Sequence, residues 1–230
     1  MSDKPYTLHH GDCLDVLSTM ADNSVDAIVT DPPYGLSFMG KKWDYDVPAT
    51  EVWVECLRVL KPGGHLLAFA GTRTQHRMAA RIEDAGFEIR DMIAWVYGSG
   101  FPKSHNGPWG GTALKPALEP ITMARKPLAG TVAANWAEHG TGALSIDGCR
   151  VPVDSVADAS QLRTMQRSVR ETNDGWGMST VIGDSPQVVR ADGRWPANLI
   201  LSYNEDEFEL RSNVTSEQRK QLLHWMYENT

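Results

Sequence analysis

Short apolar runs alternate with amphipathic stretches along the first hundred residues. Three runs are apolar almost throughout, as the buried strands of a parallel sheet are, at 25–30, 65–70 and 90–97. Two helices are predicted between them. The first ends at 61–64, where Lys-Pro-Gly-Gly suits the helix dipole and stops the helix; the second has an apolar stripe and ends at Gly86, with Met78, Ile82 and Ala85 on the stripe. This alternation predicts an α/β, doubly wound sheet with its chemistry at the carboxyl ends of the strands.

Both ends of the chain add further expected elements. The stretch 6–17 is typical of a short strand, a Gly-Asp turn and the start of a helix. Near the other end, Trp195-Pro196 leads into a strand at 197–202. A helix is predicted at about 216–229, capped by Thr215. We therefore expect a catalytic core at 1–103, a region for target recognition at 104–192, and a return strand and helix at 193–230.

Candidate chemistry follows the first predicted strand directly, at Asp31-Pro32-Pro33-Tyr34. Two consecutive prolines fix φ and push the residue before each of them into an extended conformation, so this loop is rigid. A site that acts on the exocyclic amine of a flipped-out base needs acceptors for the NH2 group and an aromatic face for the base. Asp31, the carbonyl of Pro32 and the ring of Tyr34 supply these three functions.

Asp-Pro-Pro-Tyr at the end of a strand resembles the catalytic motif of the S-adenosylmethionine-dependent DNA amino-methyltransferases. Four later segments resemble phage and prophage members of this family, at 112–121, 123–128, 142–150 and 193–200. Together the similar segments cover most of residues 5–202. The resemblance implies a Rossmann-like methyltransferase sheet, catalytic roles for Asp31, Pro32, Pro33 and Tyr34, S-adenosyl-L-methionine as methyl donor, and double-stranded DNA as substrate.

The same resemblance implies cofactor contacts at Asp12 and Asp31, although Asp12 also suits a helix cap. In the permuted subclass, where the catalytic loop lies near the amino terminus, a glycine-rich cofactor loop lies near the carboxyl end. We find no such loop here, and two imitations, at 69–72 and 98–100, stand in the wrong context. The sheet is therefore expected to be incomplete, and the chain a fragment, a degenerate copy, or one half of a split enzyme completed by a second chain.

The net charge and its distribution along the chain bear on which residues could bind DNA. The 230 residues carry a net charge of −7, which is unfavourable for phosphate contacts. The acidic excess lies mainly in 1–34 and 201–230, however, whereas 103–126 is basic. Residues 40–44 correspond to a mobile loop near the DNA in the family. The candidate DNA contacts are Lys41, Lys42, Trp43, Lys103, Lys115, Arg125 and Lys126.

The composition indicates the compartment in which the protein works. The three cysteines lack metal-ligand spacing, so we expect reduced thiols in the cytoplasm and no metal. No apolar run is long enough to span a membrane. The predicted activity is site-specific transfer of a methyl group to N6 of adenine in duplex DNA, in a restriction-modification setting. Transfer to N4 of cytosine, an RNA or protein-amide methyltransferase, and a DNA-binding remnant that is inactive without a partner remain alternatives.

Overall fold

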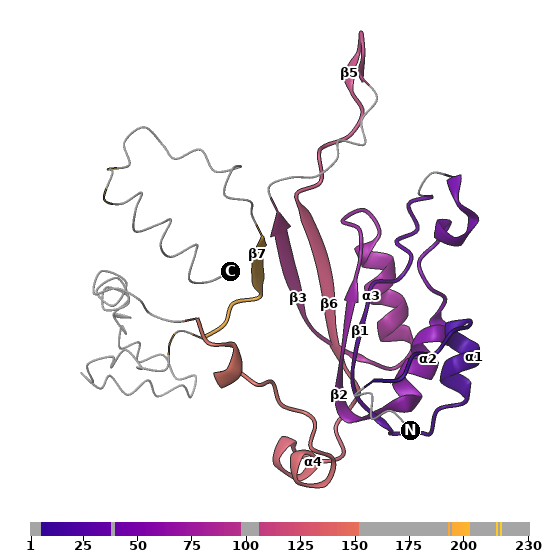
Figure 1. Ribbon diagram of the computed structural model, residues 1–230, viewed down its shortest axis with the longest axis vertical. Helices are drawn as coiled ribbons and strands as arrows, with labels where there is room; N and C mark the ends of the chain where they lie inside the picture. Colours follow the sequence, from indigo (N-terminus) through magenta and orange to yellow (C-terminus); the bar gives the residue numbers. More distant parts are fainter. Residues whose placement is uncertain are drawn as a thin grey trace, which may run out of the picture. The chain divides into compact units, whose positions relative to one another are not determined.

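The computed structural model describes residues 6–37, 40–97, 106–151, 193, 195–202, 215 and 217 (Figure 1). The chain divides into two compact units, one formed by 1–142 with 198–230 and the other by 143–197. Glu217 is helical, and the rest of the predicted helix at 216–229 lies outside the described residues. Among those described, no helix has the length and apolar character needed to cross a membrane.

The helices are α1 (Cys13–Ser18), α2 (Thr50–Val59), α3 (Gln75–Asp84) and α4 (Val132–His139), with short 3-10 turns η2 (Lys42–Asp44) and η3 (Asp147–Cys149). The strands are β1 (Val25–Thr30), β2 (Leu60–Phe69), β3 (Glu88–Tyr97), β4 (Asn106–Gly107), β5 (Gly110–Gly111), β6 (Leu118–Arg125) and β7 (Leu199–Ser202). The three expected strands of the core and the return strand are thereby confirmed.

A five-stranded sheet in the order β1-β2-β6-β3-β7 organises the first unit (Figure 1). β1 is parallel to β2 and β3 is parallel to β7, as expected for a Rossmann-like α/β fold. The sheet is nevertheless mixed, because β6 lies antiparallel between β2 and β3. The fold class is confirmed.

Two expected boundaries differ from the structure. β6 lies within 104–192, the stretch assigned to target recognition, yet it is the middle strand of the sheet, so the core extends well beyond residue 103. Residues 6–10 form no strand. Their side chains are exposed, Leu8 to 86%, and a strand needs a partner whose backbone completes its hydrogen bonds.

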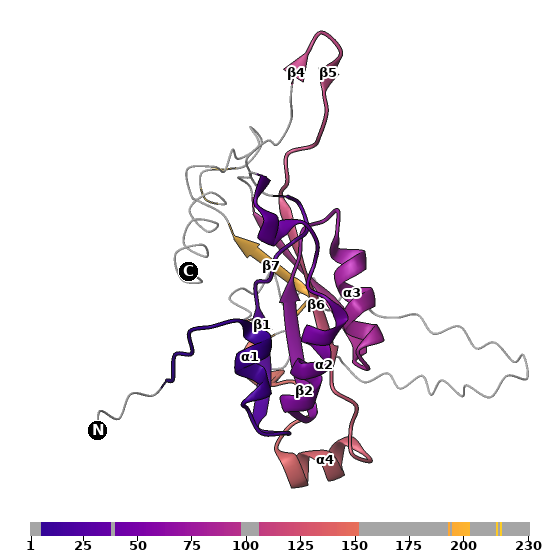
Figure 2. The same ribbon diagram turned by 90° about the vertical axis from the view of Figure 1, so that its right-hand side faces the viewer.

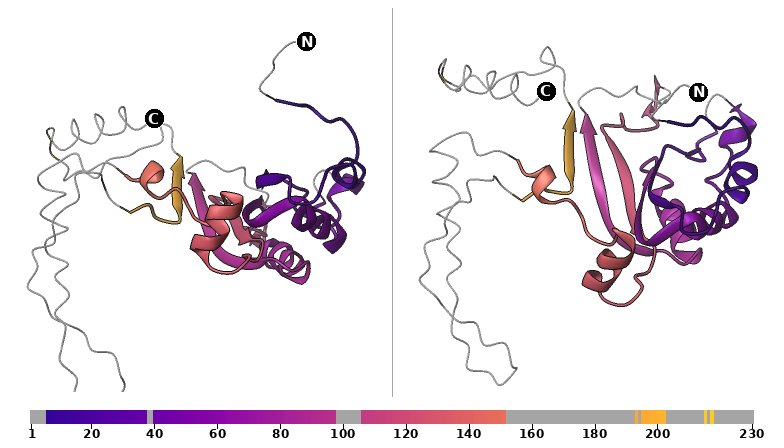
Figure 3. Two further views of the ribbon diagram at one scale, coloured as in Figure 1. Left: turned by 90° about the horizontal axis from the view of Figure 1, so that it is seen from below. Right: turned by 60° about the horizontal axis from the view of Figure 1, so that its bottom comes forward.

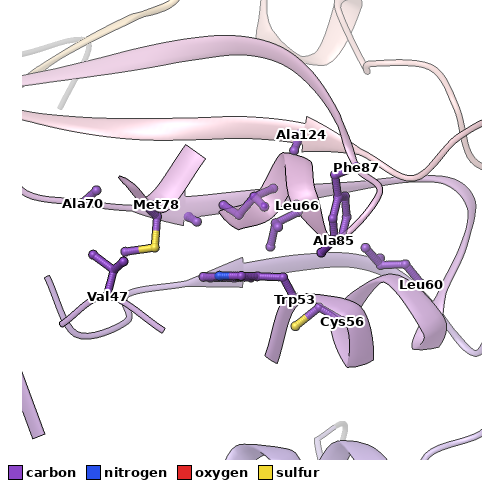
Figure 4. Packing of buried hydrophobic residues seen from close by; sticks show 12 residues of the cluster. Val47, Trp53, Cys56, Leu60, Leu66, Ala70, Met78, Ala85, Phe87 and Ala124 are labelled. Atoms are coloured by element: carbon purple, nitrogen blue, oxygen red, sulfur yellow. The ribbon is translucent and has the colours of Figure 1, made fainter. Parts of the chain in front are cut away.

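The hydrophobic core lies between α2, α3 and one face of the sheet (Figure 2, Figure 4). Trp53 of α2 is almost fully buried and packs in the same cluster as Leu66 and Ala68 of β2. Met78 and Ile82 of α3 are fully buried, which confirms the predicted apolar stripe. These contacts fix the two helices on the strands that lead to the candidate catalytic loop.

A buried asparagine joins three loops at the start of β2, where α4 lies next to that strand (Figure 3). Asn135 of α4 is fully buried; its Nδ2 donates to the carbonyls of Pro62 and Thr141, each at 2.9 Å, and its Oδ1 accepts from the amide of Ala129 at 2.9 Å. A Cβ at Gly63, where φ is +76°, would lie 2.6 Å from this Nδ2. The glycine expected to end a helix therefore makes room for the asparagine.

Replacing Asn135 with alanine is expected to lower the free energy of unfolding by about 2–4 kcal/mol, because the amide of Ala129 and the carbonyl of Thr141 lose its hydrogen bonds and the carbonyl of Pro62 keeps only the hydroxyl of Thr141. Urea denaturation of Asn135→Ala measures this directly. Asn198→Ala is the matched control, since Asn198 is exposed and its amide bonds to Asp91 and Met92 lie at the surface. An equal loss in both variants would contradict the role given to Asn135.

In the described part of the second unit, the side chain of Arg150 contacts three other residues. The guanidinium of Arg150 donates to Asp147 at 2.8 Å and to the carbonyl of Gly193 at 3.3 Å, and it lies 5.5 Å from the ring centroid of Trp195. Residues from 147–150 and 193–195 are therefore neighbours, although about forty residues separate them in the chain.

Candidate active site

The Asp31-Pro32-Pro33-Tyr34 loop leaves the carboxyl end of β1. Thr30 pairs with Ala68 of β2 in parallel register, and Ala68 in turn pairs with Thr122 of β6. Asp31 is exposed and the next three residues are half-buried. The ring of Tyr34 lies against Gly71, where an added Cβ would come within 3.4 Å of Cδ2. The same Cβ would come within 3.2 Å of Cδ1 of Leu36, so Gly71 packs closely against the candidate catalytic loop and the residues that follow it.

A buried carboxylate holds the end of this loop. Asp44 in η2 is almost completely buried, and its oxygens accept from the amides of Gly35 at 2.8 Å and Leu36 at 3.2 Å. Its own carbonyl accepts from the amide of Ser37 at 2.7 Å. Gly35 has φ of +67°, and a Cβ there would lie 2.9 Å from the amide nitrogen of Val47. Asp44 therefore anchors the candidate catalytic loop, a role that the sequence did not reveal.

Tyr34 is held from the other side by Glu119 of β6. The Tyr34 hydroxyl donates to Oε2 of Glu119 at 3.3 Å, and the Tyr97 hydroxyl at the end of β3 donates to Oε1, also at 3.3 Å. Burial raises the pKa of Tyr34 well above its usual range, reinforced by a hydrogen bond to Asp31 and by the negative charges of Glu119 and Asp31. Burial and Glu119 also raise the pKa of Tyr97. Both hydroxyls remain protonated donors at neutral pH.

A cavity of about 790 Å³ lies beside the loop. Pro32 and Pro33 line it together with residues of β1 and α2. Gly11 and Cys13, at the start of α1, also line it. Asp12, between these last two, caps α1 by accepting from the amide of Leu14 at 2.9 Å. The capping role of Asp12 is confirmed, whereas its contact with a cofactor stays a prediction.

The walls of the cavity are mostly aliphatic and aromatic, with Trp53 and Val29 among them. Such walls suit an organic molecule with an apolar body, and a small number of polar groups at the rim would orient it. Within the part of the chain that the structure describes, no three His, Cys, Asp or Glu side chains are grouped to hold a metal ion.

The model of the N6 and N4 DNA methylase family matches residues 25–222. The chain belongs to this family. It is 24% identical to the type II methyltransferase M.HindIII of Haemophilus influenzae, over 59% of this chain and 63% of that protein. It is 31% identical to the type II methyltransferase M.BglII of Bacillus subtilis, over 39% of this chain and 28% of that protein. The matches thus span less than two thirds of either relative.

Solved structures similar to this family member include TTHA0409 of Thermus thermophilus, with 27% identity, a TM-score of 0.38, and coverage of 51% of each chain. M1.HpyAVI has 23% identity and a TM-score of 0.38, over 52% of this chain and 54% of that one. Both proteins have also been solved with S-adenosylmethionine.

The candidate DNA contacts fall into separate groups. Lys41, Lys42 and Trp43 lie in or beside η2, next to the Asp44 anchor, and Trp43 is 63% exposed. Lys115 is exposed before β6. Lys103 lies outside the described residues. The lysines and tryptophan next to the anchor are therefore the candidates closest in the chain to the candidate catalytic loop.

Arg125 and Lys126 have structural contacts instead. Arg125 is buried and its guanidinium donates to Glu88 at 2.6 Å. The ammonium of Lys126 donates to the side chain of Asn23 and to the carbonyl of Leu60, each at 2.8 Å. Arg125 is the last residue of β6 and pairs with His65, whereas Ala68, which lies next to Thr30 and the loop, pairs with Thr122. We therefore do not propose Arg125 and Lys126 as DNA contacts.

Proposed function

We propose that this chain transfers a methyl group from S-adenosyl-L-methionine to N6 of adenine at specific sites in double-stranded DNA. The observation that carries the proposal is the Asp31-Pro32-Pro33-Tyr34 loop, anchored at a strand end by Asp44 and Glu119 and bordering an apolar cavity. The type II methyltransferases among its relatives support a restriction-modification setting.

In this reaction the carboxylate of Asp31 and the carbonyl of Pro32 accept hydrogen bonds from the amine, and the ring of Tyr34 stacks on the extruded base. These contacts aim the nitrogen lone pair at the methyl group. Because the amine attacks first and loses its proton afterwards, Asp31 need not be a strong base. Lys41, Lys42, Trp43 and Lys115 are the described residues that we propose for contacts with DNA.

Adenine is preferred over cytosine because Asp at the first position of the loop resembles the adenine-specific members of the family, whereas N4-cytosine members often have Ser there. The family model covers both chemistries. Product analysis of methylated DNA distinguishes them.

For the cofactor, we propose that the cavity beside Pro32, Pro33 and Asp12 forms one part of its site. Among the described strands β1 pairs only with β2, and Val29 on β1 remains 67% exposed. An exposed apolar side chain on an edge strand favours pairing with further polypeptide. A second chain that covers this edge would complete the wall of the cavity. In the alternative, a remnant that is inactive without a partner, methyl transfer depends on that second chain.

The test is transfer from labelled S-adenosylmethionine to mixed-sequence duplex DNA, followed by nucleoside mass spectrometry. We expect N6-methyladenine. If the product is N4-methylcytosine, the target base is cytosine and the assignment to adenine is wrong. Folded protein that binds duplex DNA without transfer would favour the remnant that needs a partner, and transfer to RNA alone would contradict a DNA methyltransferase.

A further inference from the structure

Most arginines and lysines that the structure describes have a partner within the chain. An acid or an amide side chain is the partner of Arg58, Lys61, Arg81, Arg90, Arg125, Lys126 and Arg150. A second group is exposed and forms no ion pair or side-chain hydrogen bond in the part of the chain that the structure describes. These residues, here called the free cations, are Lys41, Lys42, Arg73 and Arg77.

The free cations lie on two segments at the same end of the sheet. The two lysines lie at η2, in the segment that follows the candidate catalytic loop. The two arginines lie just before and within α3, which follows β2. Because Thr30 pairs with Ala68 in parallel register, β1 and β2 end side by side, and the segments that follow them leave the sheet at one place.

Direct contacts join α3 to the segment that contains η2. Gly71, just before α3, packs closely against Leu36, since an added Cβ would lie 3.2 Å from its Cδ1. Further along the helix, Arg81 pairs with Asp46 at 2.6 Å. Arg77 precedes Arg81 by one helical turn on the same side of α3. It therefore lies on the side of the helix that meets the segment after η2, one turn nearer to the candidate catalytic loop.

The stability of α3 does not explain why arginines lie at its start. The amino end of a helix carries a partial positive charge, which favours acids there and disfavours cations. The first turn of α3 nevertheless has no acid, and the side chain of its N-cap, Thr74, accepts no hydrogen bond from the helix. Arg73 and Arg77 add positive charge to this end. An anion from outside the chain would offset both the dipole and the two guanidinium groups.

We propose that the free cations together form a surface that binds the phosphates of DNA beside the target base, with Arg73 and Arg77 as its contacts on α3. This inference rests on the proposed function, which takes double-stranded DNA as the substrate. A base that reaches Asp31 must leave the duplex, so the phosphates next to it lie at this end of the sheet. Cations on two separate segments suit an extended polyanion, and phosphate contacts fix the position of a duplex without reading its sequence.

The test is the binding of a fluorescein-labelled, mixed-sequence duplex, followed by fluorescence anisotropy at a series of salt concentrations. Each phosphate contact contributes about 0.9 to the slope of log K against log salt. We expect Arg73→Gln/Arg77→Gln to reduce this slope by about 2 and to weaken the Kd about 10- to 100-fold at about 0.1 M salt. Arg73→Lys/Arg77→Lys keeps both charges and should keep the slope of the parent.

The matched control is Lys61→Gln/Arg90→Gln, which removes the same charge near the starts of β2 and β3. Its slope should equal that of the parent. The thermal midpoint of R73Q/R77Q should not fall, because the two arginines oppose the helix dipole. The proposal is overturned if R73Q/R77Q keeps the slope of the parent, or if the control or R73K/R77K loses as much as R73Q/R77Q does.

Binding and methyl transfer are measured separately, so that the two proposals can fail separately. If the parent transfers no methyl group but R73Q/R77Q reduces the slope as expected, the proposed function fails for this chain and the phosphate-binding surface stands. If the parent methylates duplex DNA but R73Q/R77Q leaves the slope unchanged, the inference alone fails. A parent that binds single-stranded RNA but no duplex DNA would overturn both.

Discussion

Replacing Asp31 with alanine is expected to lower methyl transfer by at least about 1,000-fold, because the reaction loses the charged acceptor that orients the target amine. The loop is rigid and held by neighbours, so no other side chain can move into the position of this carboxylate. Asp31 is exposed, which means that its removal leaves no cavity and no buried group without a partner. The thermal midpoint of the variant should therefore equal that of the parent.

The measurement is single-turnover transfer from labelled S-adenosylmethionine under saturating DNA. Asp26→Ala is the matched control, because Asp26 lies on β1, the strand that leads to Asp31, is exposed, and pairs at the surface with Lys61. It should keep full activity. Normal turnover by Asp31→Ala would remove the basis for assigning this loop to catalysis.

Replacing Asp44 with alanine is expected to affect both stability and activity. The amides of Gly35 and Leu36 lose their acceptor, and a buried donor left without a partner costs about 1–3 kcal/mol, so we expect a loss of about 2–4 kcal/mol in the free energy of unfolding. With its anchor removed, the loop should also position the amine less accurately, which lowers methyl transfer by about 100-fold.

Two measurements on Asp44→Ala test this prediction, urea denaturation and single-turnover transfer at a temperature where the variant is fully folded. Asp26→Ala again serves as the control, because a surface ion pair contributes at most about 1 kcal/mol. A folded variant with unchanged transfer would show that the loop keeps its geometry without Asp44. A loss of stability alone would limit Asp44 to a structural role.

Local patterns sufficed for much of the fold. The apolar runs that form β1, β3 and the second half of β2 were readable because an apolar run is a local signal for a strand. Only β2 has fully buried side chains, whereas those of β1 and β3 are half-buried or exposed. The stripe at Met78 and Ile82 was readable for the same reason, since helical periodicity alone places both on one face. The rigid loop at Asp31 was also visible, because prolines restrict their own backbone wherever they occur.

Local sequence patterns did not predict the contacts of β6. Its eight residues look like one more apolar segment, and only pairing with both β2 and β3 makes it the antiparallel centre of the sheet. The same pairing buries Arg125 against Glu88, 37 residues away, so that a cation suited to phosphate in the sequence becomes part of a structural ion pair. Charge in a sequence predicts a binding surface only if the side chain stays exposed.

The sequence by itself determined which residues could handle an exocyclic amine, since Asp31, Pro32 and Tyr34 are adjacent and their chemistry is local. Only the tertiary structure decided what holds them. Asp44 reaches back nine residues to Gly35, and Glu119 reaches across 85 residues to Tyr34. Hydrogen bonds at such separations depend on how strands and loops meet in space, and an acidic residue carries no local sign of the donor that it will find.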